Sequence, residues 1–375
     1  MVAGGAGMQP APPAGCDASR RSHPRIPFAA RHAHRALRAA ASCARPAPAP
    51  RGRAPAHDGV TLAGWNRSST MHIRILGSAA GGGFPQWNCN CPNCDGVRRG
   101  SIQARRRTQS SIAARAGDGD WLLFNASPDV LQQIQGFAPL QPARALRDTG
   151  IGAVLLMDAQ VDHTTGLYML RESLRPLQIW GTPPVREDLG AGNPILRVLG
   201  HFCGVDWHDL AVDGSEVAIA AAGGLRVRAL ALSSKAPPYS PHRHAPVPGD
   251  NIGVLLRDPH SGRSAFYAPG LGAIEPHVRE AMQQADCVLV DGTFWTDDEM
   301  RSVGAPDKSA RALGHLPQSG PGGMIEQLDA LPASTRKLLI HINNTNPILR
   351  EDSAERAELT AHGIEVCHDG LDIEL

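Results

Sequence analysis

Short apolar runs separated by polar, often glycine-rich segments dominate the chain from residue 71 onward. Residues 72–77 and the two runs that flank the Gly-Asp-Gly-Asp segment at 117–120 predict antiparallel strands, because such segments form tight hairpin turns. The same pattern predicts strands at 151–156, 177–180, 217–222, 225–232, 251–257, 264–268, 287–291 and 337–342. Helical periodicity predicts helices at 128–135, 163–172, 183–188, 276–284, 321–330 and 353–362. Many short strands flanked by helices indicate an α+β fold built as a mixed sheet sandwich.

Residues 1–70 differ sharply from the rest of the chain, because they are rich in Ala, Pro and Arg and contain only Asp17 and Asp58 as acidic residues. Such a segment cannot bury a hydrophobic core, so we predict a disordered extension. It shares its Arg-rich character with organelle transit peptides, but its repeated prolines oppose the helix that these peptides form. Because Met71 directly precedes the first strand, translation from an upstream start is a further interpretation. Residues 71–375 are predicted to form one domain.

Charge and cysteine content narrow the class of protein. The chain has 37 Lys and Arg against 36 Asp and Glu, so its overall charge does not predict a nucleic-acid or anionic-membrane partner. No apolar window is long enough to predict a membrane-spanning helix. The eight cysteines do not form the pattern of a disulfide framework, which favours a reducing, cytoplasmic location.

A glycine-rich loop at residues 77–94 ends in three cysteines with C-x-C-x-x-C spacing, namely Cys89, Cys91 and Cys94. Three thiolates this close can bind one zinc ion, which prefers soft sulfur ligands in a tetrahedral set. A redox-active thiol cluster and three unrelated thiols are the alternatives. Two prolines stiffen the loop, and Trp87 is expected to anchor it in the core, so we predict a structural zinc. Its fourth ligand must come from another part of the chain.

Polar side chains follow several of the predicted strands, where catalytic groups of layered α/β proteins gather. Asp162 and His163 begin a predicted helix, and there they can bind a metal or simply cap the helix and pack. His341 and Asp291 end two other apolar strands. If the strand before Asp162 and His163 neighbours the strand that ends at His341, two histidines and one carboxylate converge in the arrangement that non-haem Fe(II) uses. His315 precedes a Gly/Pro loop. Three roles are open for it, namely proton donor, metal ligand and solvated turn residue.

Nine segments spread over residues 71–375 closely resemble the coenzyme PQQ synthesis protein B family, where PQQ is pyrroloquinoline quinone. They are GSAAGGGFPQWNCNCPNC at 77–94, RTQSSIA at 107–113, NASPD at 125–129, ALRDTGI at 145–151, QVDHTTGL at 160–167, PPYSPHR at 237–243, FYAPGLG at 266–272, LVDGTFW at 289–295 and HINNTNPIL at 341–349. The resemblance implies a metallo-β-lactamase-like αββα sandwich with its active site at one edge of the two sheets. Residues 1–70 lie outside the resemblance.

The resemblance also implies which metal ligands this chain keeps. The superfamily motif H-x-H-x-D-H corresponds to Asp158, Gln160, Asp162 and His163, so only the last two ligands are present. His341 corresponds to a later histidine of the superfamily, whereas two further ligands are missing. A two-zinc hydrolase site is therefore not expected. The remaining carboxylate and two histidines favour a mononuclear centre and iron with oxygen over hydrolysis.

Membership of this family would mean a role in building PQQ from a glutamate and a tyrosine of a precursor peptide. One function is an Fe(II)- and oxygen-dependent hydroxylase of the tyrosine ring in the cross-linked Glu-Tyr precursor, with zinc as the alternative metal. Asp162, His163 and His341 would bind the metal, and His315 and Asp291 would support the ligands or transfer protons. The other function is a carrier that assists transport of PQQ or its precursor to the periplasm. Other PQQ biosynthesis proteins and a second copy of the chain are the expected partners.

Related phosphodiesterases with a C-x-C-x-x-C zinc use a histidine three residues after the equivalent of His341 as the fourth ligand. The corresponding residue of this chain is Asn344. This difference favours completion of the zinc by another residue or by water.

Overall fold

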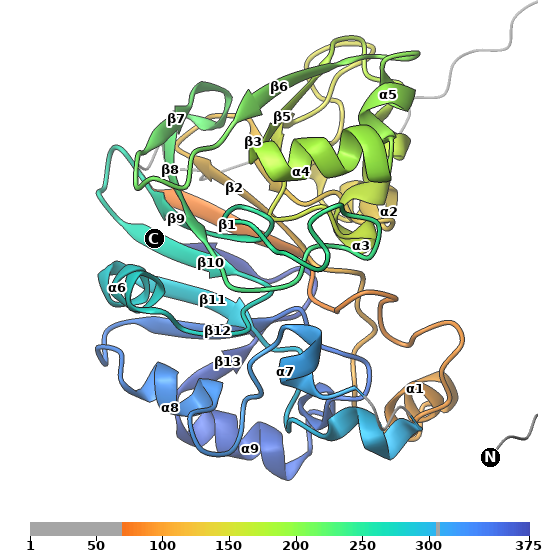
Figure 1. The fold of residues 1–375 in the computed structure, drawn as a ribbon, viewed down its shortest axis with the longest axis vertical. Coiled ribbons are helices and arrows are strands. Elements are labelled where there is room, and N and C mark those ends of the chain that lie inside the picture. Colours follow the sequence, from red (N-terminus) through yellow and green to blue (C-terminus); the bar gives the residue numbers. More distant parts are fainter. Residues whose placement is uncertain (1–69, 305–307) are drawn as a thin grey trace, which may run out of the picture. The chain divides into compact units, whose positions relative to one another are not determined.

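The computed structural model describes residues 70–304 and 308–375, so the extension predicted over residues 1–70 lies, except for Thr70, outside the described residues. Two seven-stranded sheets form the centre of the fold (Figure 1). The strands of the first sheet are, in spatial order, β14 (Asp372–Glu374), β1 (Met71–Gly77), β2 (Ser111–Ala116), β3 (Trp121–Phe124), β4 (Ile151–Leu155), β5 (Leu177–Gly181) and β6 (Val205–Asp209). Those of the second sheet are β13 (Ile364–Val366), β12 (Arg336–Ile340), β11 (Cys287–Asp291), β10 (Ser264–Ala268), β9 (Ile252–Arg257), β8 (Leu225–Ala231) and β7 (Val217–Ile219).

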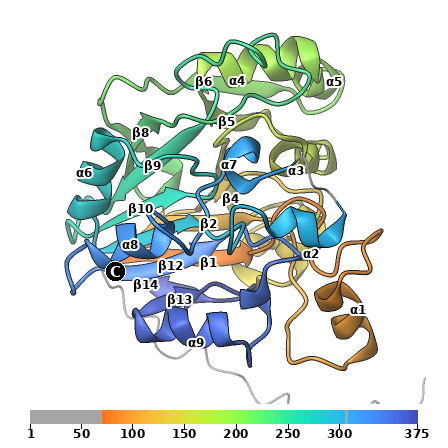
Figure 2. The ribbon, with the colours of Figure 1, turned by 60° about the horizontal axis from the view of Figure 1, so that its bottom comes forward.

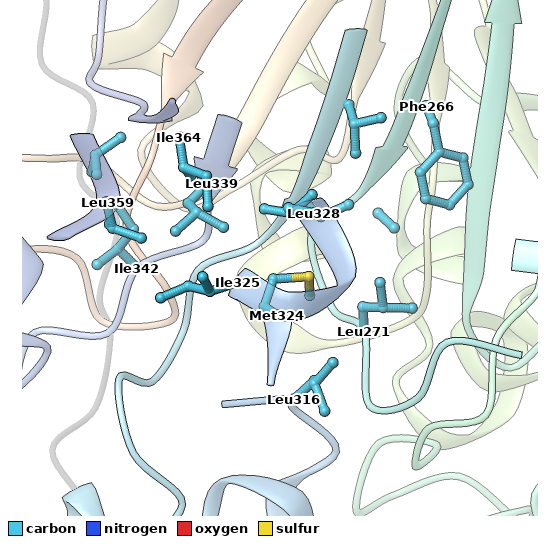
Figure 3. Close-up of a cluster of buried hydrophobic side chains, with 14 of the residues drawn as sticks. Phe266, Leu271, Leu316, Met324, Ile325, Leu328, Leu339, Ile342, Leu359 and Ile364 are labelled. Carbon is cyan, nitrogen blue, oxygen red and sulfur yellow. The ribbon is translucent and has the colours of Figure 1, made fainter. Parts of the chain in front are cut away.

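Helices cover the outer face of each sheet. The first sheet packs against α2 (Val130–Gln135), α4 (Pro183–Glu187) and α5 (Ile195–Leu199). The second packs against α6 (Pro276–Gln284), α8 (Met324–Asp329) and α9 (Ala354–Ala361). Figure 3 shows Met324, Ile325 and Leu328 of α8 and Leu359 of α9 in this layer. The remaining helices are α1 (Pro92–Arg99), α3 (Val161–Thr164) and α7 (Ala310–Leu313). Both ribbon views place α1 on the side opposite α6 (Figure 1, Figure 2). The predicted αββα sandwich is confirmed.

The apolar runs of the second sheet are continuous because both faces of its strands are buried. In β12, Leu338 and Ile340 pack between the two sheets, whereas Leu339 packs beneath the helices. In β11, Leu289 faces the opposite sheet and Val290 faces the helices. Side chains alternate between the faces of a strand, so a strand buried on both faces needs apolar residues at every position.

The predicted strands and helices are mostly present, with differences at their ends. The antiparallel hairpin of β2 and β3 across residues 117–120 is confirmed. The strand predicted at 217–222 ends at Ile219, and Ala220–Ala222 forms a 3-10 turn. The helix predicted at 163–172 is α3 followed by a 3-10 helix at Thr165–Leu170. Six elements escaped the sequence analysis because they are short or polar, namely β6, β13, β14, α1, α5 and α7.

The arrangement of the sheets brings the predicted site residues to one edge. β11 and β12 are parallel neighbours with Asp291 opposite Ile340, so Asp291 and His341 leave the sheet together. β4, which precedes Asp162 and His163, belongs to the other sheet, so it is not a neighbour of the strand that ends before His341. An isolated bridge between Asp158 and Asn251 links the end of β4 to the start of β9 in the second sheet. Face-to-face packing of the sheets, rather than strand pairing, therefore brings the two halves of the site together.

Candidate metal centre

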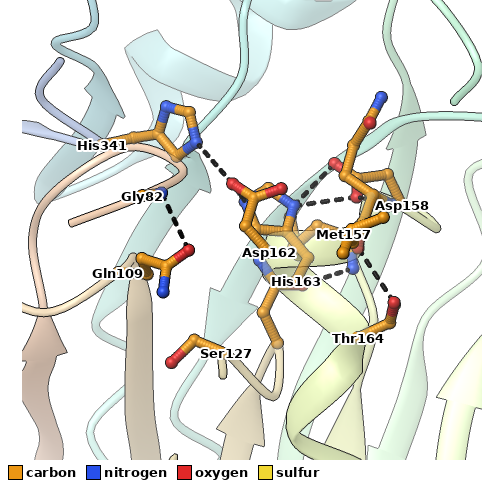
Figure 4. A network of polar contacts seen from close by, with 12 residues as sticks. Gly82, Gln109, Ser127, Met157, Asp158, Asp162, His163, Thr164 and His341 are labelled. Carbon is orange, nitrogen blue, oxygen red and sulfur yellow. Dashed lines mark hydrogen bonds and ion pairs between the residues drawn. The ribbon is translucent and has the colours of Figure 1, made fainter. Parts of the chain in front are cut away.

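Asp162, His163 and His341 point toward one another at the edge of the two sheets (Figure 4). Asp162 Oδ2 lies 3.7 Å from His163 Nε2 and 3.8 Å from His341 Nε2. One potential ligand atom from each residue lies within 4.8 Å of the other two. Ligand atoms at these separations can converge on a single divalent ion after small side-chain movements. The structure thus brings together the three residues that the sequence predicted as metal ligands.

The backbone at His341 adopts a left-handed conformation, with φ of 60°, which residues other than glycine rarely adopt. Contacts on both sides hold this conformation in place. The carbonyl oxygen of His341 lies 2.9 Å from Thr293 Oγ1, and Ile342 N donates a hydrogen bond of 2.9 Å to Ser78 O. Backbone conformations of this kind cluster at functional sites, where the surrounding structure enforces them. The conformation turns the chain sharply at the end of β12 and directs the imidazole toward Asp162.

Asp158, which the sequence analysis treated only as a lost ligand, orients His163. Its two carboxylate oxygens lie 2.8 and 2.9 Å from His163 Nδ1, so this nitrogen carries the proton. His163 Nε2 is buried and has no hydrogen-bond partner among the described residues. Metal-binding histidines commonly donate their other N–H to a carboxylate in this way. The unpartnered Nε2, aimed at Asp162, is what a metal-binding imidazole requires.

The charges of the three residues favour a cation at the centre. Burial works against ionisation of Asp162, but His163 and His341 hold the pKa of its carboxyl below the ordinary range. Burial also opposes the charged form of His163, yet Asp158 and Asp162 raise its pKa to about 9. These carboxylates therefore stabilise positive charge at the imidazole. A divalent ion at Nε2 would replace that proton and meet the same two carboxylates.

Metal affinity is expected to fall as the pH is lowered below about 9, the pKa to which Asp158 and Asp162 raise His163. The ion and the proton compete for Nε2, so each pH unit lost should cost up to about tenfold in affinity. For the stability of the metal-free protein, the effect of pH has the opposite direction. The raised pKa stabilises the fold fully below the ordinary value of 6.5, and this contribution is lost as the pH rises through about 9. Titration of Co(II) binding between pH 6 and 9 would measure the first effect, and thermal unfolding of the apoprotein the second.

Asp158→Asn should weaken metal binding by about 10- to 100-fold, because the amide holds the imidazole of His163 less firmly in its tautomer. Loss of one of the two carboxylates that raise the pKa of His163 should also move the pH dependence of binding to lower pH. Asp206→Asn, at an exposed carboxylate of β6, is the matched control and should bind metal normally. An unchanged affinity and pH profile in Asp158→Asn would show that this carboxylate does not support the ligand.

A second polar group shares His341 with this centre. Asp291 Oδ2 lies 2.6 Å from His315 Nδ1, and the rings of His315 and His341 stack with centroids 5.6 Å apart. Asp291, His315 and His341 also offer ligand atoms within 4.8 Å of one another. Burial opposes both charged forms, but attraction between the two groups lowers the pKa of Asp291 and raises that of His315. The two residues predicted to support catalysis therefore lie in contact with each other and next to the metal ligands.

Thr293 connects these two groups, and the sequence analysis assigned it no role. Its Oγ1 donates to Asp291 Oδ1 at 2.5 Å and lies 2.9 Å from His341 Nδ1. The hydroxyl can thus accept the Nδ1 proton of His341, which leaves Nε2 free to face Asp162. The only signal in the sequence was its place two residues after Asp291, at the end of an apolar strand.

The three thiols of the C-x-C-x-x-C motif lie together at the start of α1. Their sulfur atoms are within 4.8 Å of one another, and all three cysteines are free. Burial raises the pKa of the Cys94 thiol to about 12, so a thiolate there needs a nearby cation such as a metal ion. The expectation that Trp87 anchors the loop is wrong, because 85% of its surface is exposed. The loop instead contacts the cysteine sulfurs, since Gln86 N donates to Cys94 Sγ at 3.3 Å and Cys94 N donates to Cys91 Sγ at 3.5 Å.

Comparison with known proteins identifies the family. A model described as a Beta-lactamase superfamily domain matches residues 120–342. The coenzyme PQQ synthesis protein B of Azoarcus sp. (strain BH72) is 67% identical over 305 residues, which cover 81% of this chain and 100% of that protein. This chain belongs to the coenzyme PQQ synthesis protein B family. The family member from Methylobacillus flagellatus is 63% identical over 306 residues, with 81% and 100% of the two chains covered.

Solved structures agree with this assignment. The crystal structure of Zn(2+)-bound PqqB from Methylobacterium extorquens matches with a TM-score of 0.73 and 36% identity, over 81% of this chain and 100% of that chain. A diphosphatase from the PhnP family matches with a TM-score of 0.57 and 17% identity, over 82% and 97% of the two chains, and shows similarity of fold alone. The predicted metallo-β-lactamase-like fold is confirmed. Within residues 70–304 and 308–375, no helix has the length and apolar character needed to cross a bilayer.

Proposed function

We propose that this protein is an Fe(II)- and oxygen-dependent hydroxylase that acts on the tyrosine ring of the cross-linked Glu-Tyr precursor of PQQ. The observation that carries the proposal is the three-residue group of Asp162, His163 and His341, in which the buried Nε2 of His163 has no hydrogen-bond partner within residues 70–304 and 308–375. Two histidines and one carboxylate are typical of mononuclear non-haem iron sites that leave positions open for oxygen and substrate. The family assignment supports a place in PQQ biosynthesis.

The surroundings of the centre argue against a two-metal hydrolase. Asp158 directs both carboxylate oxygens to His163 Nδ1, so it acts through the imidazole and is not placed as a ligand of a second ion. Gln160 Nε2 lies 3.5 Å from the carbonyl of Lys235, and an amide is a weaker metal ligand than the histidine of the superfamily motif. A paired-metal site needs several additional ligands to clamp both oxygens of a displacement reaction. The neighbouring group of Asp291, His315 and His341 shares His341 with the first centre, and its Asp291 and His315 contact each other at 2.6 Å. We therefore favour one metal over two.

Iron bound at this centre would supply the one-electron and oxygen chemistry that amino-acid side chains lack. Hydroxylation places one oxygen atom of O2 on the ring and reduces the other to water, which consumes two electrons from an external reductant and two protons. Side-chain exposure is 24% for Asp162 and 18% for His315, against 4% for His163 and 8% for His341. Substrate is therefore expected to approach from the side of Asp162 and His315. There His315, paired with Asp291, can deliver a proton.

The decisive experiment is to load the apoprotein anaerobically with Fe(II), verify the iron content, and add the cross-linked precursor, ascorbate as reductant and oxygen. Mass spectrometry of the product should show a gain of oxygen, with the mass increased further when labelled O2 is used. Zinc-loaded protein is the control, because zinc has no redox chemistry and competes well for such ligands. A precursor that binds to the iron-loaded protein and stays unchanged would overturn the hydroxylase and favour a carrier.

For the cysteine cluster we propose a structural zinc, and the free thiols support a cytoplasmic location.

A further inference from the structure

The side-chain amide of Asn344 faces all three sulfur atoms of the cysteine cluster. Its Nδ2 lies 3.1 Å from Cys89 Sγ, 3.6 Å from Cys91 Sγ and 3.4 Å from Cys94 Sγ. Asn344 is buried and follows β12 on the same loop as His341. An atom at similar distances from three clustered sulfurs lies where the fourth ligand of a shared metal ion would be.

These distances match the geometry of a tetrahedral zinc site. With zinc–sulfur bonds of about 2.3 Å and a zinc–oxygen bond of about 2.1 Å, each sulfur lies roughly 3.6 Å from the fourth ligand atom. The distances from the amide atom of Asn344 to the three sulfurs agree with this value to within about half an ångström. The position is therefore filled by protein, and a water molecule cannot take it without displacing the side chain.

The two ends of an asparagine amide have nearly the same shape, and their assignment follows from the surrounding hydrogen bonds. An amide nitrogen has no lone pair available for a cation, whereas the amide oxygen binds one readily. No hydrogen bond holds Asn344 Oδ1 among the described residues, so a half-turn of the amide gives up only the contacts of Nδ2 with the three sulfurs, which the bond from Oδ1 to the ion replaces. We propose that Asn344 Oδ1 is the fourth ligand of a zinc ion held by Cys89, Cys91 and Cys94.

Other groups are less suited to this role. The main-chain carbonyl of Asn344 approaches only Cys91 Sγ, at 3.6 Å, and it already accepts a hydrogen bond of 3.2 Å from Asn93 Nδ2. No fourth His, Cys, Asp or Glu joins the cluster in the part of the chain that the structure describes. The sequence analysis disfavoured Asn344 because it is not a histidine. The structure shows that its side chain nevertheless reaches the vertex.

This ligand would join the cysteine cluster to the candidate active centre. Asn344 lies three residues after His341, and Asn93 on α1 donates to the carbonyls of both Asn344 and Asn346. Zinc bound by α1 and by this loop would hold the loop in place directly beyond the left-handed turn at His341. The inference does not depend on the proposed hydroxylation, because it concerns only the binding of metal to the cysteine cluster.

Asn344→Leu and Asn344→Asp distinguish oxygen ligation from N–H donation to the thiolates. Leucine supplies neither group, so Co(II) or Zn(II) affinity at the cluster should fall at least about tenfold. Aspartate keeps a ligand oxygen, so affinity should equal or exceed that of the wild type. The sulfur-to-cobalt charge-transfer absorption reports this site alone, since the other candidate centre has no sulfur ligand. Competition of zinc against bound Co(II) then gives both affinities.

Asn343→Asp is the matched control for added charge, because its side chain contacts Met300 and Thr345 instead of the thiols. It should leave the charge-transfer band unchanged. Asn344→His tests the vertex independently and should bind at least as tightly as the wild type. Wild-type affinity in Asn344→Leu would overturn the proposal. Equal or greater loss in Asn344→Asp than in Asn344→Leu would also overturn it, because that result identifies the amide as an N–H donor to thiolates.

Discussion

Replacing His163 with alanine is expected to weaken Fe(II) binding by more than about 100-fold and to abolish oxygen insertion into the precursor. The substitution removes one of three ligands and leaves the carboxylate of Asp158 without its imidazole partner. Loss of a group that merely orients a ligand already costs about 10- to 100-fold in affinity, so loss of the ligand itself should cost more. Iron content after anaerobic loading and gel filtration measures binding, and mass spectrometry of the product measures the reaction.

His341→Ala should reproduce this loss, because His341 supplies the ligand from the other sheet. His201→Ala, at an exposed histidine just after α5, is the control and should keep normal iron content and activity. Far-ultraviolet circular dichroism must show that each variant is folded. A folded His163→Ala that retained stoichiometric iron and full activity would refute the proposed ligand set.

Cys94→Ser should abolish zinc-dependent stabilisation of the fold. A ligand that binds only the folded state adds about 4 kcal/mol when its free concentration is about 1,000 times its Kd. For a domain of this size, that amount corresponds to a shift in melting temperature of roughly 8 °C. Wild-type protein should therefore lose this stability after chelation and regain it with zinc. Cys94→Ser should melt at the lower temperature under both conditions.

Cys287→Ser is the matched control, because Cys287 is as fully buried as Cys94 but lies between the sheets, away from the cluster. It measures the cost of placing a hydroxyl in the core and should still respond to zinc. A zinc response in Cys94→Ser equal to that of the wild type would exclude a structural zinc at this cluster. Melting curves by calorimetry, with zinc content measured in parallel, provide both results.

The hydrophobic pattern predicted most of the sandwich because burial on two faces leaves a strong signature in single strands. The apolar runs of β11 and β12 are continuous, which is typical of strands in a sheet that is covered on both faces. β6 was missed because its VDWHD sequence is that of a polar edge strand. β13 and β14 were missed because three residues carry too little periodicity to recognise. Local patterns thus identify long, buried elements and lose short or exposed ones.

The sequence likewise identified some residues of the candidate centre and missed others. Asp162 and His163 were recognisable because they adjoin in sequence and follow an apolar strand, and the cysteines because of their spacing. The roles of Asp158 and Thr293 depend on the direction of single side chains, which no local pattern specifies. The expectation for Trp87 failed for the same reason, because an apolar residue in a loop can point either inward or outward.

The sequence by itself determined the kinds of elements, the donor atoms available for metal binding and the family to which the chain belongs. Only the tertiary structure decided which donors meet. His163 and His341 are 178 residues apart and come from different sheets, and their meeting depends on how the two apolar faces pack. Asn344 likewise contacts thiols that lie 250 to 255 residues away in the sequence. Local sequence fixes the conformation of short segments, whereas contacts between distant segments follow from burial over the whole fold.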